Sequence, residues 1–106
     1  MSYLQTLAPT QRVIPLTGNT VVVTQTRAPL ALILVPAGTL AALTITLPTG
    51  AYDGQVCTLM TTQILTALTV NSASGSIVGD PLTTLVANAG ARYLWNVAAT
   101  TWYRVP

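Results

Sequence analysis

Residues Ala42 to Leu47 read ALTITL, and this short stretch carries the clearest pattern in the chain. Leu43, Ile45 and Leu47 alternate with threonines, and a period of two residues is typical of a strand with one buried and one exposed face. Threonine is β-branched and suits a pleated surface, while its hydroxyl keeps the outer face wet without adding charge. The stretch therefore predicts a half-buried β-strand.

Similar short runs of β-branched and apolar residues lie on both sides of this stretch, separated by Gly, Pro, Asn or Asp. The predicted strands are Thr20–Arg27, Leu30–Val35, Ala42–Leu47, Gln55–Thr61, Ala67–Asn71, Ser76–Val78, Leu82–Val86, Ala91–Val97 and Thr101–Val105. No long stretch shows a 3.6-residue apolar period, so we expect no substantial helix. Many short strands with turn signals every eight to twelve residues or so favour an antiparallel sandwich or barrel. We predict an all-β fold, an antiparallel, jelly-roll-like β-sandwich.

The N-terminal segment before Thr20 lacks this pattern. It contains Pro9, Pro15 and Gly18 and shows no sustained period, which indicates an extended N-terminal arm over residues 1–19. The β-sandwich domain is then expected over residues 20–106. The arm residues predicted to contact neighbouring subunits are Leu4, Leu7, Arg12, Val13 and Ile14.

The chain is unusually poor in charge. Its 106 residues include four Lys or Arg and two Asp or Glu, so 6% are charged, against about 25% in ordinary soluble domains. A hydrophobic content of 51% still predicts a folded chain. The arginines are scattered, so we expect no nucleic-acid partner. Because so few charges keep copies apart, we expect part of the apolar surface to lie in an oligomer interface.

The high apolar content does not predict a membrane protein. The longest apolar run, Ala28–Gly38, contains two prolines and is shorter than the roughly 20 residues of a spanning helix. The N-terminus lacks the basic start and apolar middle of a secretory signal. We therefore expect synthesis in the cytoplasm and no membrane partner.

Residues that could support catalysis are few, and the chain has no histidine. Asp53 precedes Gly54 and Asp80 precedes Pro81, positions where an Asp side chain usually binds turn amides. A hydrolase that uses both carboxylates is an alternative. Cys57 lacks a histidine to activate it and is expected to be a small buried hydrophobe. We predict no enzymatic activity, no metal site and no cofactor.

Aromatic residues concentrate near the C-terminus, at Tyr93, Trp95, Trp102 and Tyr103. Tyr93 and Trp95 share a predicted strand face with Val97, which favours core packing. Neighbouring final strands would let Trp95 meet Trp102 in the core or at a subunit contact. If exposed, Trp95, Trp102 and Tyr103 would instead form a contact surface for stacking on carbohydrate.

From Ala42 to the C-terminus, the order of short motifs resembles structural proteins of tailed bacteriophages. The motifs are ITLP at Ile45–Pro48, YDGQ at Tyr52–Gln55 followed by VCTLM, LTVN with the downstream GSIVG, ARYLWNV and TWYRV. The similar proteins are head decoration (cement) proteins and tail-fibre or tail-spike modules. The resemblance implies a jelly-roll-like virion protein, commonly a homotrimer, without enzymatic activity.

A free-standing domain with an arm suits a decoration protein best. We therefore expect a homotrimer that binds the major capsid protein on the outer surface of the virion and stabilises the shell. The alternative is a tail-fibre or spike-type module that binds a receptor or glycan.

Overall fold

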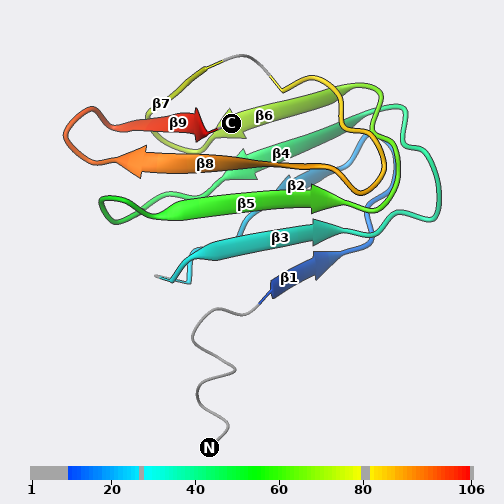
Figure 1. Cartoon of the computed structure of the whole chain (residues 1–106), viewed down its shortest axis with the longest axis horizontal. Coiled ribbons are helices and arrows are strands. Elements are labelled where there is room, and N and C mark those ends of the chain that lie inside the picture. Colours follow the sequence, from blue (N-terminus) through cyan, green and yellow to red (C-terminus); the bar gives the residue numbers. More distant parts are fainter. Residues whose placement is uncertain (1–9, 27, 80–81, 106) are drawn as a thin grey trace, which may run out of the picture.

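The computed structural model describes residues 10–26, 28–79 and 82–105, and these residues form strands, turns and loops (Figure 1). The strands are β1 (Thr10–Val13), β2 (Thr20–Val22), β3 (Leu30–Leu34), β4 (Leu43–Leu47), β5 (Val56–Thr61), β6 (Leu68–Ser72), β7 (Ser76–Val78), β8 (Gly90–Asn96) and β9 (Thr101–Val105). The prediction of an all-β fold is confirmed. In the described part of the chain, no helix is long and apolar enough to cross a membrane.

The strands form two sheets that face each other. The large sheet has the order β1-β3-β5-β8-β9-β7, and the small sheet has the order β2-β4-β6. Within β1-β3-β5 and within β2-β4-β6 every pair is parallel. The chain therefore alternates between the sheets and winds as a β-solenoid of about four turns, and the prediction of an antiparallel, jelly-roll-like sandwich is wrong.

The parallel pairing has a simple physical origin. A hairpin joins strands that are adjacent in one sheet, whereas here the loop after each early strand carries the chain to the opposite sheet. The next strand in the first sheet then runs in the same direction as its predecessor, because a whole coil separates the two. Inward and outward residues alternate with a period of two in both arrangements, so the alternation predicts strands without predicting their direction.

The second coil (β3 and β4) and the third coil (β5 and β6) are paired with a constant separation along the sequence in one region. Leu40 bridges to Leu65 and Leu43 pairs with Leu68, so both pairs have the same separation along the sequence. The two segments also read alike, LAALTI from Leu40 and LTALTV from Leu65. Each leucine thus lies against the equivalent leucine of the next coil.

The core consists of side chains that point between the sheets. Leu32 lies beside Leu59 in the large sheet, and both are almost completely buried, as is Ile45 in the small sheet. Full burial of one such side chain stabilises a fold by about 1.5–3 kcal/mol. The remaining buried hydrophobic residues are Val21, Val23, Leu30, Leu34, Leu40, Leu43, Leu47, Cys57, Leu65, Leu68, Leu82, Leu85, Tyr93, Trp95 and Trp102.

Two glutamines tie successive coils together beside this core. Gln55 is completely buried, and its Nε2 donates to Gln25 Oε1 at 2.7 Å and to the Ala28 carbonyl at 2.8 Å. Gln25 Nε2 donates in return to Gln55 Oε1 at 3.0 Å. The pair satisfies amide groups that would otherwise be costly to bury.

The C-terminal strands close one end of the solenoid. β8 runs antiparallel to β5, and β9 pairs antiparallel with β8. Trp95 and Trp102 are opposite each other in this hairpin, with ring centroids 5.2 Å apart and planes tilted by 56°. Both indoles are buried, so of the two predicted places for their contact, the core and a subunit contact, the structure shows the core.

Two segments, residues 10–13 and 82–86, differ from the predicted elements. Thr10–Val13, predicted as part of an arm, forms β1 and pairs with β3 in the large sheet. Residues 82–86, predicted as a strand, contain only an isolated bridge between Leu85 and Leu65 in their described backbone. The described fold therefore begins within the predicted arm.

Gly90 is required where β8 crosses β5. A Cβ atom at Gly90 would lie 2.3 Å from the Leu59 carbonyl oxygen, whereas one at Gly38 would have nothing within 4 Å. We expect Gly90→Ala to lower the free energy of unfolding by about 1–3 kcal/mol, the usual cost of overpacking. Gly38→Ala is the matched control and should change it little. Urea unfolding followed by tryptophan fluorescence measures both, and equal stability of the two variants would contradict the register of β8 on β5.

Candidate binding surface

The outward face of the small sheet is mostly polar. Thr20, Thr44 and Thr69 are register partners across β2, β4 and β6, and the neighbouring row consists of Thr46, Asn71 and, at the β2 edge, the exposed Val22. Hydroxyl and amide side chains of this kind bind water readily. This surface, the threonine face, is suited to contact with solvent.

The outward face of the large sheet has a different composition. Its longest uncharged row consists of the register partners Val56, Leu94, Tyr103 and Val78. We call the whole surface the apolar face, and define it by Arg12, Ala31, Ile33, Val56, Thr58, Met60, Val78, Arg92, Leu94, Tyr103 and Val105. Met60 is 39% exposed, Leu94 38% and Val78 49%, so large apolar groups lie open on it. An exposed apolar patch of this kind usually marks an interaction site.

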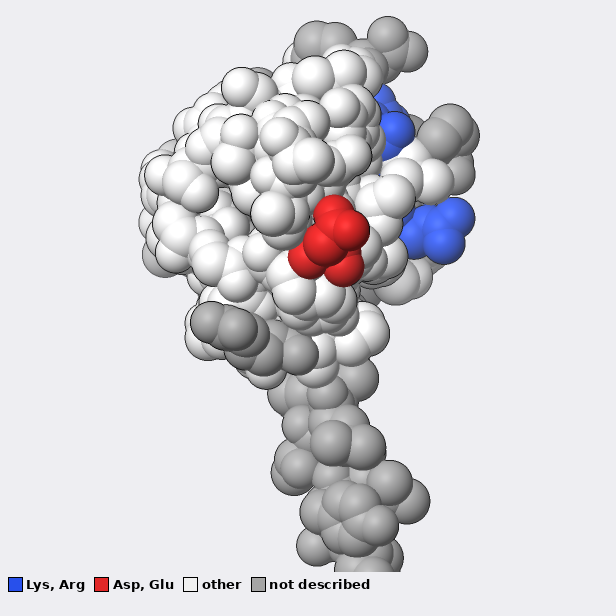
Figure 2. Space-filling view, turned by 90° about the vertical axis from the view of Figure 1, so that its left-hand side faces the viewer, with Lys and Arg blue, Asp and Glu red and all other residues white. Residues whose placement is uncertain are grey.

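The apolar face carries positive charge without a carboxylate among its described residues. Arg12 lies beside Ile33 in the register and Arg92 lies beside Thr58, and both arginines are exposed. Asp53 lies in the loop before β5, where its Oδ1 accepts a hydrogen bond from the Val97 amide at 3.1 Å. Figure 2 shows how sparse charge is on the side of the molecule that it displays. A partner surface that combines apolar groups with carboxylates would complement the apolar face.

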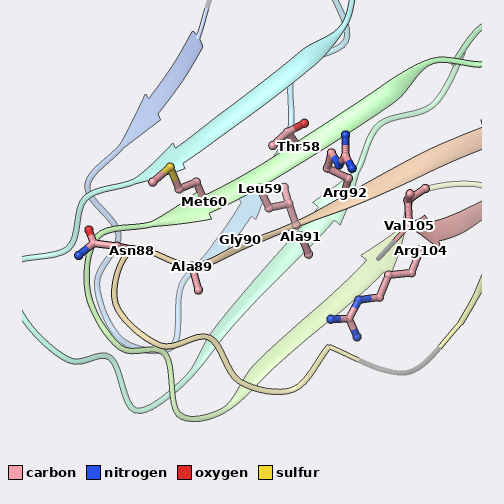
Figure 3. Close-up of a pocket in the computed structure, with 10 residues that line it drawn as sticks. All are labelled: Thr58, Leu59, Met60, Asn88, Ala89, Gly90, Ala91, Arg92, Arg104 and Val105. Carbon is pink, nitrogen blue, oxygen red and sulfur yellow. The ribbon is translucent and has the colours of Figure 1, made fainter.

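A shallow cavity of about 360 Å³ lies where β8 begins. Gly90 leaves a position without a side chain there, opposite Met60 in the register. Figure 3 shows Thr58 and Arg92 pointing to one side of the β5–β8 ladder and Arg104 to the other. The lining of the cavity therefore includes residues from both sides of the large sheet, with Arg92 on the outward side and Arg104 on the inward side.

The predicted contact residues of the arm are placed as follows. Arg12 belongs to the apolar face, Val13 packs partly buried against the core, and Ile14 is 60% exposed just after β1. Leu4 and Leu7 lie outside the described residues. The structure therefore brings one of the predicted contact residues, Arg12, onto the candidate surface.

The predicted aromatic surface needs correction. Trp95 is 7% exposed and Trp102 is completely buried, because both point into the core from the β8–β9 hairpin. Tyr103 points outward and is 37% exposed. Only Tyr103 of the three belongs to an accessible surface, and it lies on the apolar face.

The two carboxylates of the alternative catalytic site are not brought together by any described contact. Asp53 accepts a hydrogen bond from the Val97 amide, 44 residues along the chain, and not from an amide of its own turn as predicted; Gly54 after it has a φ of 83°, as expected of an Asp-Gly turn. Asp80 lies outside the described residues. Among the described residues, no group of three or more His, Cys, Asp or Glu side chains could hold a metal ion.

Several residues of the apolar face were missed at the level of sequence. Ile33 lies in the run LALILV and Met60 in the run VCTLMT, where apolar residues occupy both alternating positions. A continuous apolar run is typical of a strand that is covered on both faces. This signal was present in the sequence and indicates that the outward side of these strands is also a contact surface.

Comparison with known proteins identifies no family and no relative of the chain. No protein-family model matches the chain, and no curated protein matches it. The functional proposal therefore rests on the apolar face and on the motif resemblance.

Cys57 is a buried titratable group on the inward side of β5, the side opposite to the apolar face. It lies between Leu30 and Tyr93 in an inward row of the large sheet, and burial raises the pKa of its thiol from 9.0 to about 12. Burial also raises the pKa of Tyr93, opposed by the charge of Arg104 and reinforced by Cys57. Both groups therefore remain protonated in the fold at neutral pH.

These pKa shifts predict that the fold loses stability at high pH. Below pH 9.0 the Cys57 thiol is protonated in both states, but above it the unfolded chain loses the proton first. The free energy of unfolding should then fall by about 1.4 kcal/mol per pH unit until the folded thiol also ionises. Cys57→Ala should fall less steeply, retaining only the contribution of Tyr93. Urea unfolding between pH 8 and pH 11 or so measures both slopes, and identical slopes would contradict the assignment to Cys57.

Proposed function

We propose that the chain is a structural subunit of a virion, a capsid decoration protein that binds the outer surface of the shell through its apolar face. One observation carries the proposal. The threonine face is mostly hydroxyl and amide, with Val22 at its β2 edge, whereas the apolar face exposes Met60, Leu94 and Val78 in three strands and carries Arg12 and Arg92. A decoration protein needs such a difference, because one side contacts the shell and the other contacts solvent.

The size of the apolar face supports a stable contact. Six strands spaced about 4.8 Å apart make a surface roughly 24 Å wide, and stable interfaces commonly bury about 800 Å² on each partner. Strands about 17 Å long give the sheet itself roughly 400 Å², so the bordering loops would supply the other half of such a contact. Burial of the apolar face would then stabilise the assembled shell by mass action.

The proposed partner is the major capsid protein, contacted at an apolar surface with carboxylates. Arg12 and Arg92 would pair with those carboxylates. In this proposal the chain acts without catalysis or cofactor. The expected number of three copies comes from the motif resemblance.

The alternative of a receptor- or glycan-binding module has less support. Carbohydrate stacking needs aromatic faces open to solvent, and Trp95 and Trp102 are both buried. Of the three predicted residues only Tyr103 is exposed, and Tyr52 in the loop before β5 is equally exposed, at 37% each. We therefore favour binding to a protein surface.

The proposal predicts that apolar side chains of the apolar face determine binding. The double variant Met60→Ser, Leu94→Ser removes two exposed side chains, whose loss from an interface centre should weaken binding about 10- to 100-fold. Cosedimentation of the purified protein with preformed capsids measures the apparent affinity. Thr69→Ala, on the threonine face, is the control for substitution outside the contact.

The thermal unfolding temperature of each variant shows whether the fold is retained. Unchanged affinity of a folded double variant would contradict binding through the apolar face. Loss of binding by Thr69→Ala alone would place the contact on the threonine face instead.

A further inference from the structure

The two ends of the solenoid differ in how their strands are covered. At the end of the small sheet formed by β6, the Leu68 amide donates to the Thr83 carbonyl at 2.8 Å, so the chain folds back over this strand. At the other end the first coil supplies β1 and β2 as the edge strands of their sheets. β2 pairs with β4 on one side only among the described strands.

The hydrogen bonds of β2 identify which backbone groups point away from the sheet. The Asn19 carbonyl accepts from the Thr44 amide and the Val23 amide donates to the Thr46 carbonyl, both at 3.0 Å. Bonding alternates along a strand, so the N–H and C=O groups of Thr20 and Val22 point to the open side. The open edge therefore offers two donors and two acceptors.

A side chain already occupies the continuation of this edge. The Gln11 amide accepts from the Thr24 N–H at 2.8 Å and donates to the Thr24 carbonyl at 2.7 Å. This arrangement imitates one residue of a neighbouring strand. The available edge is thus short and centred on Val21.

The edge lacks the features that usually prevent strand pairing. No charged residue occurs between Ile14 and Thr26, and β2 itself contains no proline, although natural edge strands are commonly protected by lysines, prolines or bulges. Val22 is 62% exposed, and Ile14 and Leu16 in the same coil are 60% and 69% exposed. Unpaired backbone groups beside exposed apolar side chains are suited to another strand.

We propose that this edge, β2 together with Ile14 and Leu16, pairs with β2 of a second copy of the chain. The strands run antiparallel across a two-fold axis near Val21, so that Thr20 of each copy lies opposite Val22 of the other. Each opposite pair then exchanges two backbone hydrogen bonds. The two small sheets become one continuous sheet.

Charge favours a second copy at this edge rather than at the apolar face. A two-fold contact brings the same patch of both copies together. At the apolar face this would gather Arg12 and Arg92 of both copies without a carboxylate from the described residues of the face, whereas the β2 edge has no charge to repel. The inference does not rest on the proposed binding to a capsid, and it puts a two-fold pair in place of the three copies that the motif resemblance implies.

Because the edge is short, the contact belongs to the small class of interfaces and dissociates readily. Sedimentation velocity of the full chain from micromolar to near-millimolar concentration should therefore reveal a monomer–dimer equilibrium. Val22→Lys places a charge on the edge and should weaken dimerisation at least tenfold. Val86→Lys, at a side chain that is 66% exposed elsewhere, is the matched control and should leave it unchanged.

A second variant tests the backbone bonds themselves. Val22→Pro removes an N–H that β4 does not use, and proline is tolerated on the open side of an edge strand. It should abolish dimerisation while tryptophan fluorescence reports a retained core. If this variant does not fold, Val22→Lys alone decides.

Three results would overturn the inference. The wild-type chain could remain monomeric throughout the concentration range, or it could form a trimer in place of a dimer. Val22→Lys and Val86→Lys could also dimerise equally well. Slower hydrogen exchange of the Val22 amide at higher protein concentration would support the pairing directly, and an unchanged rate would oppose it.

Discussion

The fold depends on the stacking of inward side chains between successive coils, with leucine on leucine where the segment around β4 lies against the segment around β6. Two conditions must hold together in a parallel solenoid: backbone hydrogen bonds require strands about 4.8 Å apart, and inward side chains must fill the space between the sheets without voids. Leu40 over Leu65 and Leu43 over Leu68 satisfy both, because equal side chains keep equal coil cross-sections. The buried Gln55 and the half-buried Gln25 meet the same requirement for the polar groups where the chain passes between coils.

Sequence predicted the strands well and their arrangement poorly. Alternation in ALTITL located β4 because a half-buried strand has the same period in any sheet. Whether two neighbouring strands run parallel depends on whether a whole coil of chain separates them, and alternation does not give the length of a coil. The repeat of LAALTI as LTALTV does give that length, because the separation of the two segments along the sequence is one coil. Internal repeats are the sequence signature of solenoids, and this one was too short and too degenerate to stand out.

The candidate surface was partly predictable for a similar reason. The aromatic residues were predicted as a possible contact surface from their side-chain chemistry, yet Trp95 and Trp102 face inward because the register of β8 on β9 places them opposite each other in the core. Ile33, Met60 and Leu94 were not predicted as surface contacts, since a single exposed aliphatic residue is ordinary. Their meaning depends on lying in adjacent strands of one sheet, which only the three-dimensional register reveals. Arg12 was predicted to lie in an arm because its strand, β1, is only four residues long and pairs with β3, which comes later in the chain.

The equal offset of the middle coils has a consequence for how such a protein can change in length. A coil of this kind adds one strand to each sheet and leaves the closing β8–β9 hairpin and the first coil untouched. Duplication or loss of one coil would therefore alter the molecule along a single direction. The width of its large sheet would grow or shrink in increments of about 4.8 Å, one strand at a time. The spacing of groups along that direction can therefore be set by the number of coils, without redesign of the core.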